Sequence, residues 1–527
     1  MRDIMRNFVK SILIVGGGSS GWMTAAYLSK AYGHKVKISL IEEPSIPKIG
    51  VGEATIPNLQ RVFFDFLGLK EQDWMPHCNA SFKSAIKFVG WNAESDSTDY
   101  SYHMFGQLKE VNGIPLSHYW AHLKNTGQTS EQFAYACYNK AKLLDAKLSP
   151  KDRDGRSRMS HAWHFDAHLV ADYLRGLSVS WGVEHIQGEV VETRLNESGG
   201  IKSVRTQSGA EIAADFFVDC SGFKGLLINQ ALDEPFIDMS RYLLCDSAVA
   251  ASIAHDDEAN GVEPYTSAIA MSSGWTWKIP LLGRFGSGYV YSSSFCSKET
   301  ATEDFMKLWG VREDQVKLNH IKFRTGRNRR AWVKNCVSIG LSSCFLEPLE
   351  STGLYFIYAA IYQFAQHFPD ATLDSRLADS FNKKIEMMFD DCRDFIQTHY
   401  FTTSRNDSDF WRANKHDLKI SDSLHEKLNA YNAGLVVCPP VTTNESDYYG
   451  NFDLEFSNFW TNSNYYCMFA GLDWVPEKSN PKLVYHDEWM KQALAEFQSL
   501  KWEEEELSAT LPTTYDYLLN IRGTRSA

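Results

Sequence analysis

Residues 12–42 constrain the fold of this chain more than any other stretch. Four apolar residues at 12–15 precede a glycine-rich run at 16–21, which leads into an apolar segment with helical spacing. Gly16, Gly18 and Gly21 match G-x-G-x-x-G, in which glycines allow a tight turn, close approach of a pyrophosphate and close packing of helix on strand. The pattern predicts a buried strand, a turn and a helix whose free N–H groups favour an anion.

An acidic residue completes this unit. A second apolar strand is expected at 36–41, and Glu42 and Glu43 follow it, so Glu42 lies 21 residues beyond Gly21. A carboxylate at this distance meets a ribose hydroxyl in dinucleotide-binding folds. The alternative is a glycine-rich turn without a ligand. The complete pattern favours an α/β fold with a Rossmann-type nucleotide site.

Composition narrows the class of protein. The 527 residues contain 53 Lys and Arg against 65 Asp and Glu, a net charge of −12 that disfavours nucleic acid or an anionic membrane as a partner. Ten scattered cysteines without a Cys-x-x-Cys pair predict neither a zinc site nor a disulfide scaffold, and favour the cytoplasm. We expect no signal peptide and no membrane span. The aromatic content of 13% suggests sites lined by rings.

Two segments after the first unit have both a structural and a functional interpretation. Residues 47–57 form a glycine- and proline-containing loop that either only connects elements or brings Glu53 and backbone amides to the dinucleotide. Residues 80–91 alternate as one strand, with Lys83 and Lys87 on its second face. From the pattern alone, a solvated edge strand is the favoured interpretation of those lysines.

Farther along, residues 103–160 are expected to be an irregular insertion folded onto the core. Trp275, Trp277 and Ile279 share one face of a predicted strand, which is typical of a buried core. Another buried strand ends at Gly340, and Ser351 or Thr352 is positioned to cap a long apolar helix. The same helix start could hold a halide or the charge of a reduced flavin on its N–H groups.

Three motifs together resemble the flavin-dependent tryptophan halogenases, specifically the 6-/7-halogenase group. They are G-x-G-x-x-G at 16–21, Trp-x-Trp-x-Ile-Pro at 275–280 and Glu-Ser-Thr-Gly at 350–353, and the resemblance covers nearly the whole chain. It implies a flavin-monooxygenase-like FAD-binding domain with an added, largely helical substrate portion. The implied division is a core at 1–373, with a substrate-lining insertion at about 92–160, and a helical portion at 374–527 packed on it.

The resemblance also implies a chemistry. Reduced FAD from a separate NAD(P)H-dependent flavin reductase, O2 and chloride or bromide would give hypohalous acid, which would halogenate the benzo ring of free L-tryptophan. Lys83 would capture the oxidant and Glu350 would stabilise the cationic ring. Gly16, Gly18, Gly21, Glu42 and Gly340 would contact FAD, and Thr352 and Gly353 the halide. The implied tryptophan pocket consists of His103, Phe105, Tyr448, Tyr449, Glu455, Phe459 and Asn464.

Several alternatives stay open at this point. A flavin monooxygenase shares the FAD fingerprint but needs its substrate at the flavin, which the bulky Trp275 and Trp277 disfavour. A halogenase of another indole, a phenol or a pyrrole, and a catalytically silent flavin-binding protein, are the others. The segment between Trp91 and Tyr102 is shorter than the family pattern, so the ring carbon, with C6 or C7 ahead of C5, is not fixed. Halide preference and a homodimer are equally open.

Overall fold

The computed structural model describes residues 7–45, 53–92, 99–442, 444, 452 and 459–523. The predicted strand–turn–helix–strand unit lies in the middle of a six-stranded sheet of order β10-β2-β1-β14-β23-β22. The strands up to β23 are parallel and β22 is antiparallel. In that order they are Glu184–Gln187, Lys37–Glu42, Ser11–Val15, Phe216–Asp219, Cys336–Ser338 and Trp332–Val333. This arrangement confirms the α/β prediction.

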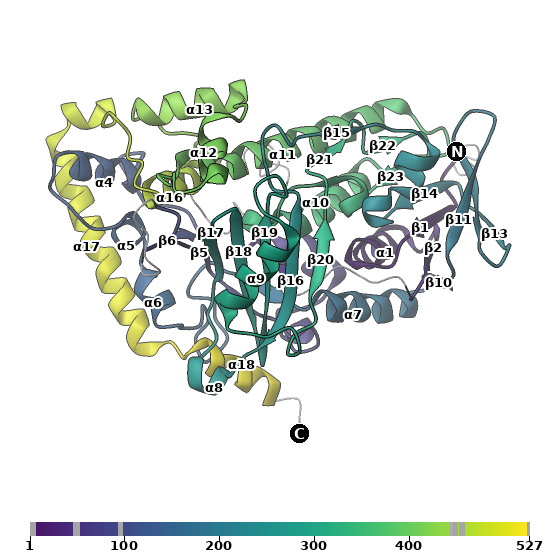
Figure 1. Cartoon of the computed structure of the whole chain (residues 1–527), viewed down its shortest axis with the longest axis horizontal. Coiled ribbons are helices and arrows are strands. Elements are labelled where there is room, and N and C mark those ends of the chain that lie inside the picture. The colour runs from purple at the N-terminus through teal and green to yellow at the C-terminus, as the bar shows by residue number, and fades with distance from the viewer. Residues whose placement is uncertain are drawn as a thin grey trace.

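Helices cover this sheet because its central strands are apolar on both faces. Helix α1 (Ser19–Tyr32) packs between α7 (Ala167–Ser180) and α10 (Thr352–Gln366), at the right of Figure 1. A parallel sheet of continuous apolar strands requires such cover. The small antiparallel sheet β11-β12-β13 extends beyond it, with strands Val190–Leu195, Ile201–Thr206 and Glu211–Ala213.

A second, seven-stranded sheet occupies the centre of Figure 1, with the order β20-β16-β19-β18-β17-β5-β6. Its neighbours are antiparallel except for β17 and β5. In that order the strands are Asn319–Lys322, Ser247–Ala254, Arg284–Tyr291, Gly274–Leu281, Thr266–Met271, Ala85–Val89 and Tyr100–Met104. Helices α8 (Asp257–Asn260) and α9 (Lys298–Trp309) lie in the connections.

The single strand predicted for residues 80–91 is wrong. The chain forms β4 (Ser81–Lys83) and β5 (Ala85–Val89), which belong to different sheets, with the break at Ser84. Strand β4 pairs with β9 (Ala162–Phe165), which in turn pairs with β3 (Glu53–Ala54). Lys83 is therefore completely buried instead of lying on a solvated edge. Alternation identifies the two faces of a strand, but it does not reveal what covers the second face.

The insertion at 103–160 is more regular than the sequence suggested. It contains the hairpin β7-β8 (Glu110–Val111 and Ile114–Pro115) and helices α4 (Leu116–Asn125), α5 (Phe133–Cys137) and α6 (Ala141–Asp145). Helices α5 and α6 have only five residues each, too few to show an apolar period in the sequence.

From Ser375 onward the described elements are helices. They are α11 (Ser375–Thr402), α12 (Asp409–His416), α13 (Asp422–Asn432), α16 (Asn462–Gly471), η7 (Pro481–Tyr485), α17 (Asp487–Thr510) and α18 (Thr514–Gly523). Helix α17, in yellow in Figure 1, packs along α4, α5 and α6, where Glu504 accepts a hydrogen bond from the Lys142 backbone. No helix among the described residues is long and apolar enough to cross a membrane.

Short elements complete the fold and join the two large sheets. Helical turns lie at η2 (Gln60–Phe64), α2 (Asp65–Leu67), α3 (Glu71–Trp74), η3 (Gly222–Lys224), η4 (Leu226–Ala231), η5 (Gly340–Ser342) and η6 (Leu349–Ser351). A third small sheet, β15-β21-β24, comprises Phe236–Asp238, Gly326–Asn328 and Cys344–Phe345.

Candidate active site

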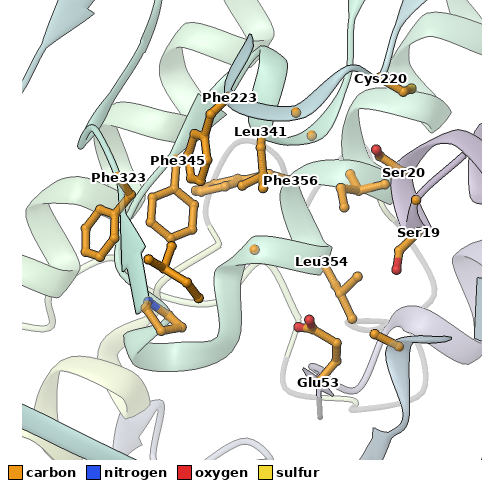
Figure 2. Close-up of a pocket in the computed structure, with 18 of the residues that line it drawn as sticks. Ser19, Ser20, Glu53, Cys220, Phe223, Phe323, Leu341, Phe345, Leu354 and Phe356 are labelled. Atoms are coloured by element: carbon orange, nitrogen blue, oxygen red, sulfur yellow. The ribbon is translucent and has the colours of Figure 1, made fainter. Parts of the chain in front are cut away.

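A cavity of about 750 Å³ lies between the two large sheets. Its walls come from the glycine-rich turn, from β18 and from the start of α10. Figure 2 shows Ser19 and Ser20 on one side, Phe223, Phe323 and Phe345 on the other, and Glu53 with Leu354 between them. A cavity that is mostly apolar and has a few convergent polar groups is typical of a cofactor site.

The glycines of the turn form a cradle at one end of this cavity. Gly16 has φ +115°, and a Cβ there would lie 2.2 Å from the carbonyl oxygen of Cys220. A Cβ on Gly21 would lie 1.9 Å from the Gly16 carbonyl oxygen, so helix α1 packs directly on the turn. A Cβ on Gly18, which precedes α1, would meet no atom within 4 Å. Gly18 therefore borders open space at a helix N-terminus, where a pyrophosphate fits.

The acidic residues expected at the nucleotide both line the cavity. Glu42 is buried, and its Oε1 lies 3.0 Å from Nε2 of His185, while Glu43 is half-buried. Gly340, with φ +81°, lies beside Ser20 on the same wall. Burial and the neighbouring Asp166 carboxylate raise the pKa of Glu53 to about 7. The set of groups thus suits a dinucleotide, with Glu53 as an additional acid at its border.

Two tryptophans close the side of the cavity formed by β18. Trp275, Trp277 and Ile279 all line it, as their shared strand face predicted, and the two indole centroids lie 6.2 Å apart. Gly288 on β19 makes room for Trp277, because a Cβ at Gly288 would lie 2.2 Å from the indole ring. These rings reduce the space for an aromatic substrate in the large cavity.

Lys83 is buried with no exposed surface. Its Nζ donates hydrogen bonds to the Thr55 carbonyl oxygen at 3.0 Å and to Ser351 Oγ at 2.8 Å, and lies 5.0 Å from the centre of the Phe105 ring. Burial lowers the pKa of Lys83 to about 7, although the Glu350 carboxylate opposes this shift. Near neutral pH the amine can therefore be both an ammonium donor and a free nucleophile.

The buried lysine predicts a pH-dependent cost in stability. Its pKa is about 7 in the folded chain against an ordinary 10.5, so between these values the unfolded chain holds a proton that the folded chain lacks. The stability of the wild type should therefore rise with pH across this window. We expect the Lys83→Met variant to melt at a higher temperature than the wild type at pH 7, with the difference shrinking towards pH 10. Thermal denaturation at several pH values measures it, and a gap that widens with pH would contradict it.

Glu350 is held by two histidines. Its carboxylate lies 2.8 Å from Nδ1 of His103 on β6 and 2.8 Å from Nε2 of His399 on α11, and all three side chains are buried. Burial alone would raise the pKa of Glu350, but His103 and His399 hold it well below its usual range. The two histidines thus favour the charged form of a buried carboxylate, the kind of group that stabilises a nearby cation.

The turn that carries Glu350 is strained. Glu350 and Ser351 have φ values of +66° and +61°, a left-handed conformation that side chains other than glycine rarely adopt. The expectation that Ser351 caps helix α10 is wrong, because its side chain makes no capping bond and instead accepts from Lys83. The strain thus points the Ser351 hydroxyl at the lysine while Glu350 faces the histidines.

The predicted halide residues lie at the start of α10. The Thr352 hydroxyl is buried and has no hydrogen-bond partner among the residues that the structure describes. Gly353 lines the large cavity, and a Cβ there would meet no atom within 4 Å. An open helix N-terminus next to a buried hydroxyl can accept a small anion.

A second, smaller cavity of about 30 Å³ lies on the other side of Glu350. It includes four residues predicted for the substrate pocket, namely His103, Phe105, Phe459 and Asn464. Tyr448, Tyr449 and Glu455, predicted for the same pocket, lie outside the described residues, as do 93–98 of the short segment before β6. Since Glu350 lines both cavities, it stands at their boundary.

Sequence reasoning missed several residues of this site. His399 lies near the end of the 28-residue helix α11, where no local motif distinguishes it from other polar residues. Trp460 lines the second cavity and stacks on Phe395, with centroids 3.9 Å apart. Ser351 did offer a signal, because it lies within the Glu-Ser-Thr-Gly motif, but this signal pointed to a helix cap.

Residues 11–488 match a family model described as tryptophan halogenase. The chain is 53% identical to tryptophan 6-halogenase ThaL of Streptomyces albogriseolus, covering 98% of this chain and all of that one. It is 52% identical to tryptophan 7-halogenase RebH of Lentzea aerocolonigenes, with 98% and 100% coverage. The solved structure of Tar14, a tryptophan C-6 flavin-dependent chlorinase from taromycin biosynthesis, has a TM-score of 0.88 at 38% identity and covers 97% of this chain and 100% of its own.

Proposed function

This chain belongs to the tryptophan halogenase family and is a flavin-dependent enzyme, and from that premise we propose that it halogenates the benzo ring of free L-tryptophan with hypohalous acid. The oxidant would come from O2 and chloride or bromide at reduced FAD, which a separate flavin reductase supplies. The ten free cysteines fit a reducing compartment such as the cytoplasm.

One observation carries the proposal. A buried carboxylate, Glu350, lines both the large cavity and a second cavity lined by aromatic rings. The buried amine of Lys83 contacts one lining residue of each, since it donates to Ser351 of the first and lies 5.0 Å from the centre of the Phe105 ring of the second. Ser351 connects them, since it follows Glu350 in the chain and accepts a hydrogen bond from Lys83. An oxidant made in the first cavity would pass between Lys83 and Glu350 before it meets a substrate held beside Phe105 and Phe459.

The large cavity suits FAD because it contains the glycine cradle, the open space at Gly18 and the acid pair at 42–43. Gly16, Gly18 and Gly21 would hold its pyrophosphate, Glu42 its ribose, and Gly340 would border its ring system. When bound in reduced form, FAD supplies the electrons that activate O2 for oxidation of the halide. Trp275 and Trp277 keep the aromatic substrate away from it, and the free N–H groups of Thr352 and Gly353 would hold the halide.

Lys83 would carry the halogen between the two sites. As an ammonium it would donate a hydrogen bond to the oxygen of hypohalous acid and direct the halogen outward. As a neutral amine it would form an N–X bond as the O–X bond breaks, and the amine proton and hydroxide would leave as water. Because burial places its pKa at about 7, both forms are available near neutral pH.

Glu350 would complete the substitution on the ring. Transfer of X⁺ from oxygen or nitrogen forms the C–X bond and leaves a positive charge on the indole. The buried carboxylate would stabilise this cation and then accept the proton from the same ring carbon, which restores aromaticity. Phe105 and Phe459 would hold the indole, and the segment that contains Tyr448, Tyr449 and Glu455 would address its amino-acid group.

The ring carbon would be C6 or C7. The two relatives are named as a 6-halogenase and a 7-halogenase, and their identities to this chain, 53% and 52%, are nearly equal. Purified protein incubated with FAD, NADH, a flavin reductase, tryptophan and chloride or bromide tests the proposal, with the product identified by mass and NMR. A halotryptophan substituted at C6 or C7 is expected. Consumption of NADH without any halotryptophan, but with turnover of another indole, a phenol or a pyrrole, would reject free tryptophan as the substrate.

The nucleotide assignment predicts the effect of a change at Gly18. A valine there would fill the open space beside the N-terminus of α1, where the pyrophosphate would lie, without a clash inside the protein. We expect Gly18→Val to fold normally and to lose at least about tenfold in FAD affinity, measured by fluorescence titration. Gly176→Val in helix α7, at another glycine where a Cβ would meet no atom within 4 Å and where φ is not positive, is the control for folding. Unchanged FAD affinity in Gly18→Val would reject the site.

A further inference from the structure

Asn464 was expected to contact the substrate, but its side chain is engaged elsewhere. It is the third residue of helix α16, and its Oδ1 accepts a hydrogen bond from the Thr461 backbone N–H at 2.8 Å. Its Nδ2 lies 3.0 Å from Nε2 of His103. A backbone N–H can only donate, so the amide oxygen must face Thr461 and the amide nitrogen must face His103. The helix cap thus determines the orientation of this amide.

The orientation of the amide determines the proton on His103. Because Nδ2 of Asn464 donates, Nε2 of His103 must accept and therefore carries no hydrogen. The ring then keeps its hydrogen on Nδ1, which lies 2.8 Å from the Glu350 carboxylate and donates to it. When the partner of one imidazole nitrogen can only donate, the hydrogen of the neutral ring must be on the other nitrogen.

The contacts of His399 fix the hydrogen on its Nδ1 but not the proton at its Nε2. Its Nδ1 lies 3.0 Å from the Phe395 carbonyl oxygen, and carbonyl oxygens only accept, so Nδ1 carries a hydrogen. Its Nε2 lies 2.8 Å from Glu350 Oε1, and two acceptors at that distance need a proton between them. This proton can belong either to the imidazole or to the carboxylate.

We propose that Asn464 is a positioning residue that holds His103 as a neutral Nδ1–H donor to Glu350, so that of the two histidines only His399 shares a proton with this carboxylate. The tautomer follows from the contacts alone, whereas its importance for turnover rests on the proposed function. A fixed donor on one side holds the carboxylate in place, and the shared proton on the other side determines its charge.

Nitrogen NMR of the full chain labelled with ¹⁵N-histidine tests the tautomer without any reaction. The His103 signals, identified by their loss in His103→Gln, should show a protonated Nδ1 and a bare Nε2 near neutral pH. In Asn464→Asp, one carboxylate oxygen still accepts from Thr461, but the other faces Nε2, which should now become protonated. A hydrogen on Nε2 in the wild type, or no change in Asn464→Asp, would overturn the proposal.

Kinetics separate positioning from substrate contact. We expect Asn464→Asp to lower kcat at least about tenfold, since an imidazole in the wrong tautomer is costly to catalysis, with the tryptophan Kd changed less than about threefold. A raised Kd with unchanged kcat would instead make Asn464 a substrate contact and overturn the positioning role.

The matched control is Asn462→Asp on the same helix. Asn462 is also buried, accepts from the Val437 N–H and donates to Ser117 Oγ. The Ser117 hydroxyl can rotate to donate to a carboxylate, whereas a bare imidazole nitrogen cannot donate without gaining a proton. Asn462→Asp should therefore keep kcat within about threefold of the wild type. An equal loss of kcat in both variants would trace the effect to a buried carboxylate on α16 and overturn the proposal.

Discussion

Replacing Lys83 by methionine is expected to reduce halotryptophan formation at least about a thousandfold, while FAD binding and reoxidation of the flavin continue. Methionine has a similar length and suits a fully buried position, but it can neither donate to hypohalous acid nor form an N–X bond. Without the proposed halogen carrier Lys83, the indole would no longer receive the halogen, whereas the FAD cradle is untouched. Product mass and oxygen consumption, measured on one sample, test both halves of this expectation.

The outcome of Lys83→Met depends on where the oxidant goes. Hypohalous acid that is no longer captured should escape and halogenate an added electron-rich scavenger in solution. Lys87→Met on the next strand is the control, because Lys87 is half-buried and lies 3.5 Å from the centre of the Tyr100 ring, away from Glu350. It should retain turnover within about threefold. Wild-type turnover in Lys83→Met would restore a purely structural role for this lysine.

Changing Glu350 to glutamine is expected to lower turnover by about a hundredfold to a thousandfold, with the tryptophan Kd changed less than about fivefold. The ring carries its positive charge only in the intermediate and the flanking transition states, so a carboxylate lowers the barrier without tightening ground-state binding. Glutamine keeps the shape and can still accept from His103, but it removes the charge and the proton acceptor. Calorimetry gives the affinity, and single-turnover rates give the chemical step.

Glu347 offers a matched control on the same segment. It is as buried as Glu350, and its Oε1 accepts a hydrogen bond from the Tyr400 hydroxyl at 2.5 Å. Burial raises the pKa of Glu347 to about 7, so much of it is neutral at the working pH and glutamine replaces it with little change in charge. Glu347→Gln should therefore stay within about fivefold of the wild type. A stable Glu350→Gln variant that retains FAD and normal turnover would remove Glu350 from the chemistry.

The local elements of the fold could be predicted where one segment supplies its own pattern. The strand–turn–helix–strand unit, the aromatic face of β18 and the start of α10 each depend on spacing within some forty residues or fewer. The prediction of a single strand at residues 80–91 was wrong because the alternating pattern continues across Ser84, where the chain passes from one sheet to another. The prediction of an irregular insertion was wrong in part because two of its helices have only five residues, too few to show an apolar period.

The same difference between local patterns and distant contacts applies to the candidate site. The resemblance proposed Lys83 and Glu350 for the chemistry, but their environments come from distant parts of the chain. The hydrogen bond from Lys83 to Ser351 spans 268 residues, and that from His103 to Glu350 spans 247. His399 carries no motif, and the contact between Asn464 and His103 spans 361 residues, because a residue's partner across such separations is not encoded in its neighbours.

The sequence by itself thus determined the nucleotide-binding unit and the family, because both depend on residue types at short, regular spacing, and the resemblance to the family proposed Lys83 and Glu350 as the reactive side chains. Only the tertiary structure decided that Lys83 is buried with a lowered pKa, and that Glu350 lies between a fixed donor and a shared proton. Burial, distance and hydrogen-bond polarity are properties of several packed segments at once. They emerge where β4, β6, α10, α11 and α16 meet, and none of these segments contains them alone.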